Sequence, residues 1–390
     1  MLKPPDWSKL GFGFDLKVAG HIEIRHHLST GKWTTPTIVV DPNITISGLS
    51  PGLNYGQQCY EGLKAFRTPS SSSSSPNNTN NKNNAITIFR PTFHHARLAR
   101  SAASVSLPCP PEALFLETLR LAVASNAAFV PPADNAQEAY LYIRPVLFGA
   151  SARLTLGPPE EVILAVYVQP GRPYHGSAAL DGLVLEGFDR AAPRGMGGYK
   201  VGGNYAPVWR HAAEAQRLGY GITLHVDCVT RELVEEFSTS GFLGHRVDLV
   251  DGEEKRHVLV VPQTESAIAS ATSDSIARIA EREGWVVERV AVPLATLAGL
   301  DEVVAVGTAA AAVPIRSITR LSTGEKYVFA NSAREDGTIV GLAKLMTGIQ
   351  RGVLEDTEGW CWEVKGYPQQ RAAGGGSFIG SILNAVMGRL

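Results

Sequence analysis

Apolar residues recur along the chain with two different periods, which predict a mixture of strands and helices. Short runs rich in β-branched and aromatic residues predict strands at residues 139–143, 162–168, 183–185, 222–226, 286–292 and 303–306. Apolar residues at three-and-four spacing predict helices over residues 111–120, 207–218 and 274–283. Pro111 starts the first helix, and Gly219 and Gly284 end the other two. Because no regular strand-helix-strand alternation is present, the pattern favours an α+β fold over a doubly wound nucleotide-binding fold.

Two polar stretches interrupt this pattern. Residues 69–84 are mostly serine and asparagine, with almost nothing apolar to bury, and predict a disordered insertion. Apolar segments flank it closely on both sides, so we expect it at the tip of a hairpin. The second stretch, residues 169–176, is dense in proline and glycine and predicts a change of domain. The expected parts are a small N-terminal α/β domain (1–169), a linker (170–182), a large C-terminal domain (183–365) and a flexible tail (366–390).

Composition favours small-molecule chemistry. The chain has 390 residues, of which 44% are hydrophobic, and 36 basic residues nearly balance 37 acidic ones. A net charge of −1 provides no basic field for nucleic acid or for an anionic membrane surface, so we expect neither partner. The four cysteines are far apart without a C-x-x-C motif, which predicts free thiols. The histidine pairs at 26–27 and 94–95 lack metal-ligand spacing and are interpreted as ordinary surface or helix residues, so no metal is expected.

Both ends of the chain were searched for signals that would set its cellular compartment. No apolar run is long enough to cross a bilayer, and the first two dozen residues contain Asp6, Asp15 and Glu23, which an import signal would avoid. We therefore expect a cytoplasmic protein. A weak alternative is a peroxisomal address, because the final Gly388-Arg389-Leu390 is similar to the serine-lysine-leucine signal.

The most informative residue is Lys200, which has glycine pairs on both sides and Tyr205 five residues later. Glycines let the backbone approach a ligand closely, and a partly desolvated lysine amine has a lowered pKa that leaves it nucleophilic toward an aldehyde. This predicts a lysine that reaches a bound cofactor. One alternative is a surface lysine in a flexible turn. The other is a nucleotide-binding loop, but Val201 follows Lys200 where such a loop has serine or threonine.

Other constellations fit a cofactor site. Glu236, beside Glu235, could keep a pyridine nitrogen protonated, but the alternative is a solvated acidic pair. Arg97 could bind a phosphate, or form a surface salt bridge.

Two further segments are suited to an anion. Thr272 and Ser273 lie at the start of the predicted 274–283 helix, where free N–H groups favour an anion, although from these residues alone plain N-capping is the preferred interpretation. Gly307-Thr308 follows a predicted strand and could complete a phosphate cup or form a tight turn.

Ordered sequence blocks connect these residues to a known family. They are residues 53–67 (Leu-Asn-Tyr-Gly-Gln-Gln-Cys-Tyr-Glu-Gly-Leu-Lys-Ala-Phe-Arg), 89–102, 142–146 (Tyr-Ile-Arg-Pro-Val), 200–205, 234–236 and 307–309. With these blocks the chain resembles, over residues 10–365, the branched-chain amino acid aminotransferases among the fold-type IV pyridoxal phosphate enzymes, most closely the eukaryotic kind. The resemblance implies a two-domain fold with pyridoxal 5'-phosphate at the domain interface.

The resemblance also implies roles for individual residues. Lys200 is the catalytic residue and binds the cofactor covalently, Tyr205 bonds the ring oxygen, and Glu236 pairs with the pyridinium. The residues implied for the phosphate are Arg97, Ala271, Thr272 and Thr308. The residues implied around the substrate are Tyr55, Tyr60, Tyr142, Arg144, Tyr174, Thr308 and Ala309, with loops of the small domain reaching across a homodimer interface.

The implied activity is transfer of the amino group of a branched-chain or related aliphatic L-amino acid to 2-oxoglutarate. The chain departs from the family pattern at Gly241, where the family has asparagine, at Tyr60, where it has phenylalanine, and in residues 269–273, where proline and arginine are missing. These departures leave open an unusual amino acid of a specialised pathway. Rival readings are a D-amino acid or amine transaminase, an aminodeoxychorismate-cleaving enzyme, or a relative without cofactor that has only a binding role.

Overall fold

The computed structural model describes residues 4–7, 10, 17–69, 84–135, 138–154, 156–172, 178–250, 254–308, 311–329 and 338–366. Some predictions concern residues outside this description. They are residues 70–83 of the predicted insertion, Tyr174, Ala309, and residues 367–390 of the predicted tail, which include Gly388-Arg389-Leu390. In the described part of the chain, no helix is long and apolar enough to span a bilayer.

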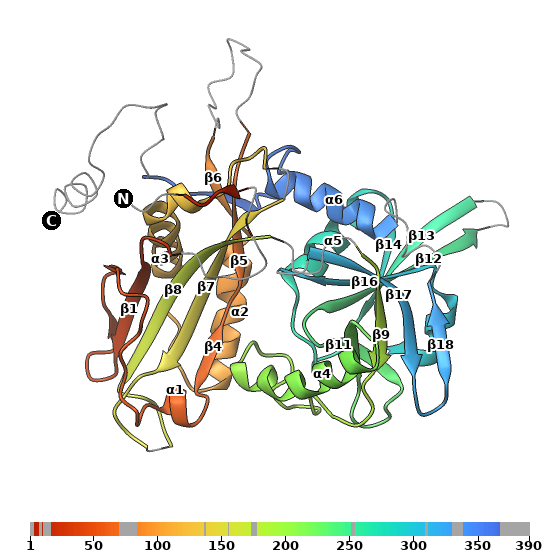
Figure 1. Cartoon of the computed structure of the whole chain (residues 1–390), viewed down its shortest axis with the longest axis horizontal. Helices are drawn as coiled ribbons and strands as arrows, with labels where there is room; N and C mark the ends of the chain where they lie inside the picture. Colours follow the sequence, from red (N-terminus) through yellow and green to blue (C-terminus); the bar gives the residue numbers. More distant parts are fainter. Residues whose placement is uncertain are drawn as a thin grey trace, which may run out of the picture.

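The first sheet is antiparallel and forms the left half of Figure 1. Its nine strands run in the order β19-β6-β5-β7-β8-β1-β2, with β3 beside β1 and β4 beside β7. They are β1 (His21–His27), β2 (Lys32–Trp33), β3 (Thr37–Val39), β4 (Gln58–Tyr60), β5 (Leu63–Arg67), β6 (Ile86–Phe89), β7 (Tyr140–Gly149), β8 (Glu161–Gly171) and β19 (Cys361–Glu363). The helices of this half are α1 (Pro51–Asn54), α2 (Pro91–Ser104), α3 (Glu112–Ser125) and the short 3-10 helix η2 (Ala127–Phe129). Because α3 packs on β1 and β8, its apolar side chains fill the core with those of the central strands.

The predicted hairpin around the insertion is confirmed. Strands β5 and β6 pair antiparallel, with Arg67 opposite Ile86 at the end from which the insertion departs. The predicted strand at 139–143 is longer than expected and continues through Pro145 to Gly149. The Pro145 carbonyl accepts a bond from the Glu61 N–H at the break between β4 and β5. Because the N–H and C=O of a strand residue point the same way, the N–H that proline lacks would face this break, where the ladder is already irregular.

The second sheet is mixed and forms the right half of Figure 1. Its order is β14-β13-β12-β16-β17-β9-β10-β11-β15, with β18 beside β17, and β9 lies parallel to both neighbours. The strands are β9 (Leu180–Val184), β10 (Ile222–Val226), β11 (Leu233–Phe237), β12 (Gly241–Val250), β13 (Glu254–Pro262), β14 (Val286–Val290), β15 (Val292–Pro293), β16 (Glu302–Gly307), β17 (Ala311–Arg320) and β18 (Glu325–Val328). The helices are η3 (Gly202–Asn204), η4 (Ala206–Val208), α4 (Trp209–Arg217), α5 (Ala271–Arg282), η5 (Leu294–Gly299) and α6 (Thr338–Gln350).

Helix α5 begins three residues before the predicted start at 274. Ser270 has extended backbone dihedrals, and its hydroxyl accepts a hydrogen bond from the Ser273 N–H at 3.1 Å, so it is the N-cap. The helix ends before Gly284, whose φ of +83° suits glycine, as the sequence predicts. The earlier start places Ala271 and Thr272 in the first helical turn.

The two halves meet at a shared apolar cluster. Phe66, Phe89 and Tyr140 of the first sheet pack with residues of β12, β13, β16, α5 and α6. Arg90, at the start of α2, donates to Ser275 Oγ at 2.8 Å and pairs with Asp274 at 2.6 Å, which fixes α5 against α2. The chain changes sheets between Gly171 and Leu180, within the predicted linker, but β19 returns to the first sheet and pairs with β6. The division into domains at 1–169 and 183–365 stays a prediction.

Candidate active site

The glycine-rich segment around Lys200 is a folded turn packed against the first sheet. The Lys200 N–H donates to Ser101 Oγ of α2 at 2.9 Å, and its carbonyl accepts from the Tyr60 N–H at 3.1 Å. Gly202 lets the Gln58 side chain pack closely, because a Cβ there would lie 2.1 Å from Gln58 Nε2. The alternative of a flexible surface turn is therefore wrong.

The Lys200 side chain points at two tyrosines. The 3-10 turn η3 brings Tyr205 back toward Lys200, and Nζ lies 2.9 Å from Tyr205 Oη. Nζ also lies 4.8 Å from the centre of the Tyr60 ring, and the two tyrosine rings pack edge to face. The amine thus has one fixed hydrogen-bond partner and an aromatic wall.

Glu236 is a buried carboxylate that lines the same cavity as Lys200. Both Glu235 and Glu236 are buried, so the alternative of a solvated acidic pair is wrong. Burial raises the pKa of Glu236 to about 7, although the Arg190 guanidinium opposes the shift. Arg190 Nη2 lies 2.6 Å from Glu236 Oε1 without the geometry of a hydrogen bond, and that oxygen has no hydrogen-bond partner among the described residues. An oxygen in this state is suited to a protonated nitrogen of a bound ligand.

Arg97 is held by a carboxylate behind it. Its Nε and Nη2 donate to the two oxygens of Glu61, each at 2.7 Å, and Nη1 donates to the Ala269 carbonyl at 2.7 Å, just before α5. His94 Nδ1 lies 2.6 Å from the same carboxylate. Burial would raise the pKa of Glu61, but Arg97 and His94 together lower it well below its ordinary range. The ion pair is buried, so the alternative of a surface salt bridge is wrong.

The start of α5 and the adjoining strand ends form an anion cradle beside Arg97. The N–H groups of Ala271 and Thr272, in the first turn, have no acceptor within the helix. The buried hydroxyls of Ser240 and Ser273 have no hydrogen-bond partner among the described residues. Thr308 follows β16 and lines the same cavity as Arg97. Free N–H groups, hydroxyls and a guanidinium are the donors that a phosphate needs.

Gly241 makes room in this cradle. A Cβ at Gly241 would lie 2.7 Å from Ser273 Oγ, so the departure from the family's asparagine is matched by a serine in the α5 turn.

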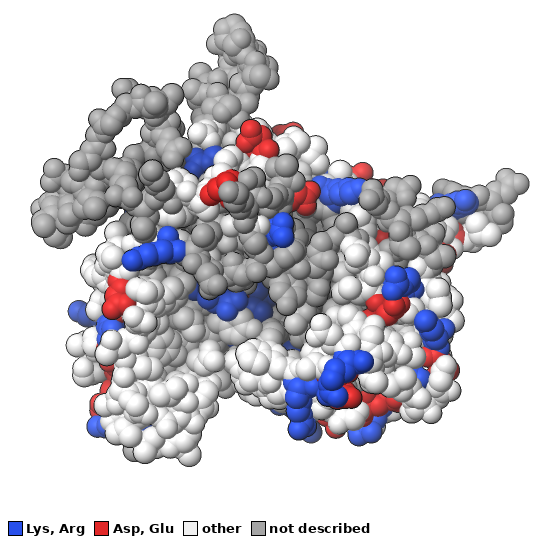
Figure 2. Space-filling view, viewed as in Figure 1, with Lys and Arg blue, Asp and Glu red and all other residues white. Residues whose placement is uncertain are grey.

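The opposite wall is aromatic and basic. Tyr142 and Arg144 project from β7, and Arg144 Nη2 donates to Tyr142 Oη at 3.1 Å while its guanidinium lies 4.8 Å from the centre of the Tyr60 ring. Gly62 leaves space for Tyr142, because a Cβ there would lie 2.1 Å from the tyrosine oxygen. The cavity between these walls has a volume of about 180 Å³. Lysine and arginine atoms are visible in the hollow between the two halves in Figure 2.

Comparison with known proteins identifies the family. A model of the family described as amino-transferase class IV matches residues 80–318, which is more than half of the chain. The chain belongs to the class IV aminotransferases.

Individual relatives of this aminotransferase extend over almost its whole length. Transaminase htyB of Aspergillus rugulosus is 45% identical over 377 residues, covering 93% of this chain and 94% of the relative. Aminotransferase poxL of Penicillium oxalicum is 45% identical over 359 residues, covering 91% and 92%. Aminotransferase TOXF of Cochliobolus carbonum is 41% identical over 351 residues, covering 89% and 93%. These names state the reaction and no amino acid.

Solved structures confirm the fold. The branched-chain amino acid aminotransferase of Escherichia coli superimposes with a TM-score of 0.66 at 23% identity, covering 89% of this chain and all of that one. The corresponding enzyme of Thermobaculum terrenum, in its pyridoxal phosphate form, gives a TM-score of 0.68 at 19% identity, covering 90% and 100%. The predicted α+β, fold-type IV architecture is thereby confirmed.

The cofactor of the family is pyridoxal 5'-phosphate, as expected from the sequence, and the described side chains fit it. The Ser240 and Ser273 hydroxyls, which have no hydrogen-bond partner among the described residues, and the α5 N-terminus match the phosphate. Glu236 Oε1 is ion-paired with Arg190 but accepts no hydrogen bond from the described residues, so it can accept one from a protonated ring nitrogen. Lys200 lines the same cavity, and its amine donates to Tyr205 Oη there.

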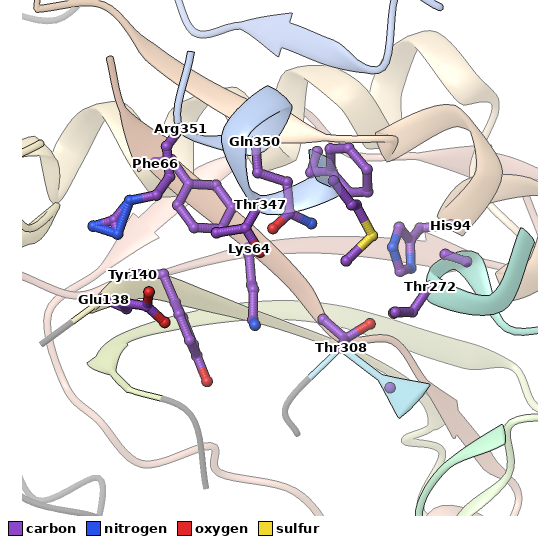
Figure 3. A pocket seen from close by; sticks show the side chains of 14 residues that line it. Lys64, Phe66, His94, Glu138, Tyr140, Thr272, Thr308, Thr347, Gln350 and Arg351 are labelled. Atoms are coloured by element: carbon purple, nitrogen blue, oxygen red, sulfur yellow. The ribbon is translucent and has the colours of Figure 1, made fainter. Parts of the chain in front are cut away.

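The structure brings most predicted site residues together. Those that line the cavity of the aminotransferase are Tyr60, Arg97, Tyr142, Arg144, Lys200, Tyr205, Glu236 and Thr308. Ala271 and Thr272 do not line this cavity but an adjoining one, which shares Gly307 and Thr308 with it (Figure 3). The exposed Tyr55 does not line it either and donates to the Leu154 carbonyl. Sequence reasoning missed Arg190 and the Glu61–Arg97 pair, since both depend on contacts between distant segments.

Proposed function

We propose that this aminotransferase moves the amino group of a branched-chain or related aliphatic L-amino acid to 2-oxoglutarate, giving a 2-oxo acid and glutamate. The observation that carries the proposal is the presence, in one cavity, of the Lys200 amine bonded to Tyr205 and of the buried Glu236 carboxylate. The Lys200 amine can move a proton, and the Glu236 carboxylate can hold a positive charge in place.

Each of these residues has a distinct part. Lys200 attaches the cofactor and, once free, takes the proton from the substrate α-carbon and returns it during the same half-reaction. Tyr205 fixes the position of Nζ, and the Glu236 carboxylate holds a proton at the ring nitrogen. When bound, pyridoxal phosphate supplies the electron sink for the charge that develops at that carbon.

The walls support an aliphatic amino acid and a dicarboxylate acceptor. The rings of Tyr60, Tyr142 and Tyr205 give an apolar surface for a branched side chain. Arg144 offers the positive charge that the second carboxylate of 2-oxoglutarate requires.

The second candidate function is transamination of an unusual amino acid in a specialised pathway. Tyr60 places a hydroxyl where the family has phenylalanine, and burial raises its pKa, so it remains a hydrogen-bond donor. A polar group on the substrate side chain would use that donor. The names of the relatives, which give no amino acid, leave this candidate open.

We also propose that the enzyme is a homodimer in which Tyr55 reaches the site of the other subunit. Tyr55 lies outside its own cavity and is exposed, together with Leu53, Leu154 and Leu156. Neighbouring exposed apolar side chains are typical of an interface. Sedimentation should give twice the chain mass of 41.7 kDa.

A donor panel tests the function. Purified enzyme is given 2-oxoglutarate with L-leucine, L-isoleucine, L-valine, D-alanine or 3-methylbutylamine, and glutamate formation is measured. We expect activity with the L-branched-chain donors that is lost in Lys200→Ala and kept in the control Lys326→Ala, an exposed lysine of β18. Activity with only D-alanine or only the amine would contradict the proposal, and activity with none of them would favour the second candidate.

A further inference from the structure

A second recess adjoins the active site on the first sheet, and we call it the β1 recess. It is lined by residues of β7 and β8, by the start of β1, and by the segments just before β1 and just after β3, and it has a volume of about 470 Å³. Tyr142 and Arg144 line both this recess and the Lys200 cavity. The two spaces therefore meet at the side chains of β7.

The strand register continues the wall of the active site into the β1 recess. Where β7 pairs with β8, Gln169 lies opposite Tyr142 and Tyr167 lies opposite Arg144. Side chains directly opposite in an antiparallel pair lie on the same face of the sheet. On the next strand, the ring of His21 stacks on Tyr167 with ring centres 4.3 Å apart. Two strand spacings, roughly 10 Å, separate β7 from β1, which is more than a leucine side chain can span.

The walls of the β1 recess are largely apolar and are fixed by their own contacts. They include Val18, Pro42 and the flat pair of rings of His21 and Tyr167. Tyr167 Oη donates to the Pro42 carbonyl at 3.1 Å, and His21 Nε2 lies 3.0 Å from Glu23 Oε1. The recess is thus formed before any ligand arrives, as is usual for sites that bind small molecules.

The volumes of the two spaces differ in a way that bears on the substrate. The Lys200 cavity has about 180 Å³ and must also receive the cofactor, which leaves little room for a long side chain. The β1 recess has more than twice this volume. Small-molecule sites usually enclose roughly 300–1,000 Å³, so the two spaces together have the size of one complete site.

We propose that the β1 recess holds the outer part of the substrate side chain, so that the enzyme accepts uncharged straight-chain L-amino acids longer than leucine. The inference rests on the proposed function and names a substrate class within it. A short side chain ends before Arg144, and a long one continues past it over Tyr167 toward His21. A terminal ammonium group is disfavoured, because Lys17 and Arg144 are cations and no carboxylate of the described residues lines the recess.

The test measures the binding of carboxylic acids that are not turned over. The holoenzyme is titrated with 4-methylpentanoate, hexanoate, heptanoate and octanoate, following the visible cofactor band. Burial of one more methylene group strengthens binding roughly fourfold, so octanoate, with two more carbons than 4-methylpentanoate, should bind roughly 15-fold more tightly.

Variants of Gln169, which is half-buried and lines the β1 recess, separate loss of space from loss of the amide group. Gln169→Trp fills the recess and should abolish the gain of octanoate over 4-methylpentanoate. Gln169→Leu has nearly the size of the wild-type side chain and should keep the gain. The control Gln216→Trp changes an exposed glutamine of α4 and should behave as the wild type does.

Turnover gives a second readout. With 2-oxoglutarate as the acceptor, we expect kcat/KM for L-2-aminooctanoate to equal or exceed that for L-leucine. Gln169→Trp should lower the ratio of these two values about 10-fold or more, because only the longer side chain reaches the β1 recess.

Other outcomes would overturn the proposal. Equal affinity of the wild type for octanoate and 4-methylpentanoate would show that the recess does not receive the side chain. An equal loss of all four acids in Gln169→Trp would make the effect structural, and a changed sedimenting mass of this variant would show that the recess receives another subunit. Because the acids are not turned over, failure of transamination with every donor would contradict the proposed function and leave the binding result for the recess intact.

Discussion

Replacement of Glu236 by glutamine gives a sharp test of how burial sets the chemistry of the site. The change keeps the size of the side chain and removes its charge. Burial raises the pKa of Glu236 from 4.5 to about 7 in the folded protein. At about 1.4 kcal/mol for each tenfold change in the dissociation constant, the ionised carboxylate costs the cofactor-free protein roughly 3 kcal/mol.

The sign of the pH effect follows from the raised pKa. Below pH 4.5 the carboxyl group is protonated in both the folded and the unfolded chain, so it has no cost. Between 4.5 and about 7 the unfolded chain ionises first, so the free energy of unfolding falls as the pH rises. Above about pH 7 the full cost is present.

The assay is urea unfolding of the cofactor-free protein at pH 5 and pH 8. We expect Glu236→Gln to gain roughly 2 to 3 kcal/mol relative to the wild type between these two pH values. The control Glu355→Gln changes an exposed carboxylate and should show no such gain. An equal difference between Glu236→Gln and wild type at both pH values would refute the reasoning. With cofactor bound, the same variant should turn over slowly while retaining the cofactor, because the ring nitrogen loses its counter-charge.

Three further changes test the surrounding groups. Glu61→Gln leaves Arg97 buried without its counter-charge. We expect the unfolding free energy to fall by about 3–5 kcal/mol and pyridoxal phosphate to bind at least ~10-fold more weakly. Unchanged cofactor affinity would contradict this role of Glu61. Gly241→Ala should weaken cofactor binding several-fold, since its Cβ would lie 2.7 Å from Ser273 Oγ. Adding Ser273→Ala should relieve the clash and restore cofactor affinity. If cofactor affinity is not restored, this contact is not the cause. Lys64 of β5 is buried, and burial lowers the pKa of its amine from 10.5 to about 7. Lys64→Met should therefore stabilise the cofactor-free protein most below pH 7, where the buried amine is charged, and the gain should fade toward pH 10.5. A gain independent of pH would argue against the lowered pKa.

The sequence predicts those parts of the site that local structure assembles. Tyr205 reaches Lys200 because one 3-10 turn separates them, so spacing alone brings the pair together. Ser270, Ala271 and Thr272 form a cap and a first helical turn, which is also a local event. The exact start of α5 was missed, because the capping Ser270 lies four residues before the expected helix.

The remainder depends on which distant segments pair. Arg190 reaches Glu236 only because the segment after β9 lies beside β11, and Glu61 reaches Arg97 only because the chain after β4 packs on α2. The return of β19 to the first sheet has no local signal at all.

The central claim is that Lys200 carries the cofactor. The most direct measurement is borohydride reduction of the holoenzyme followed by proteolysis and mass spectrometry of the peptides. We predict a phosphopyridoxyl group on the peptide that contains Lys200 and bleaching of the visible band. A modification on another lysine, such as Lys64, or no modification of an enzyme that has bound the cofactor, would contradict the account.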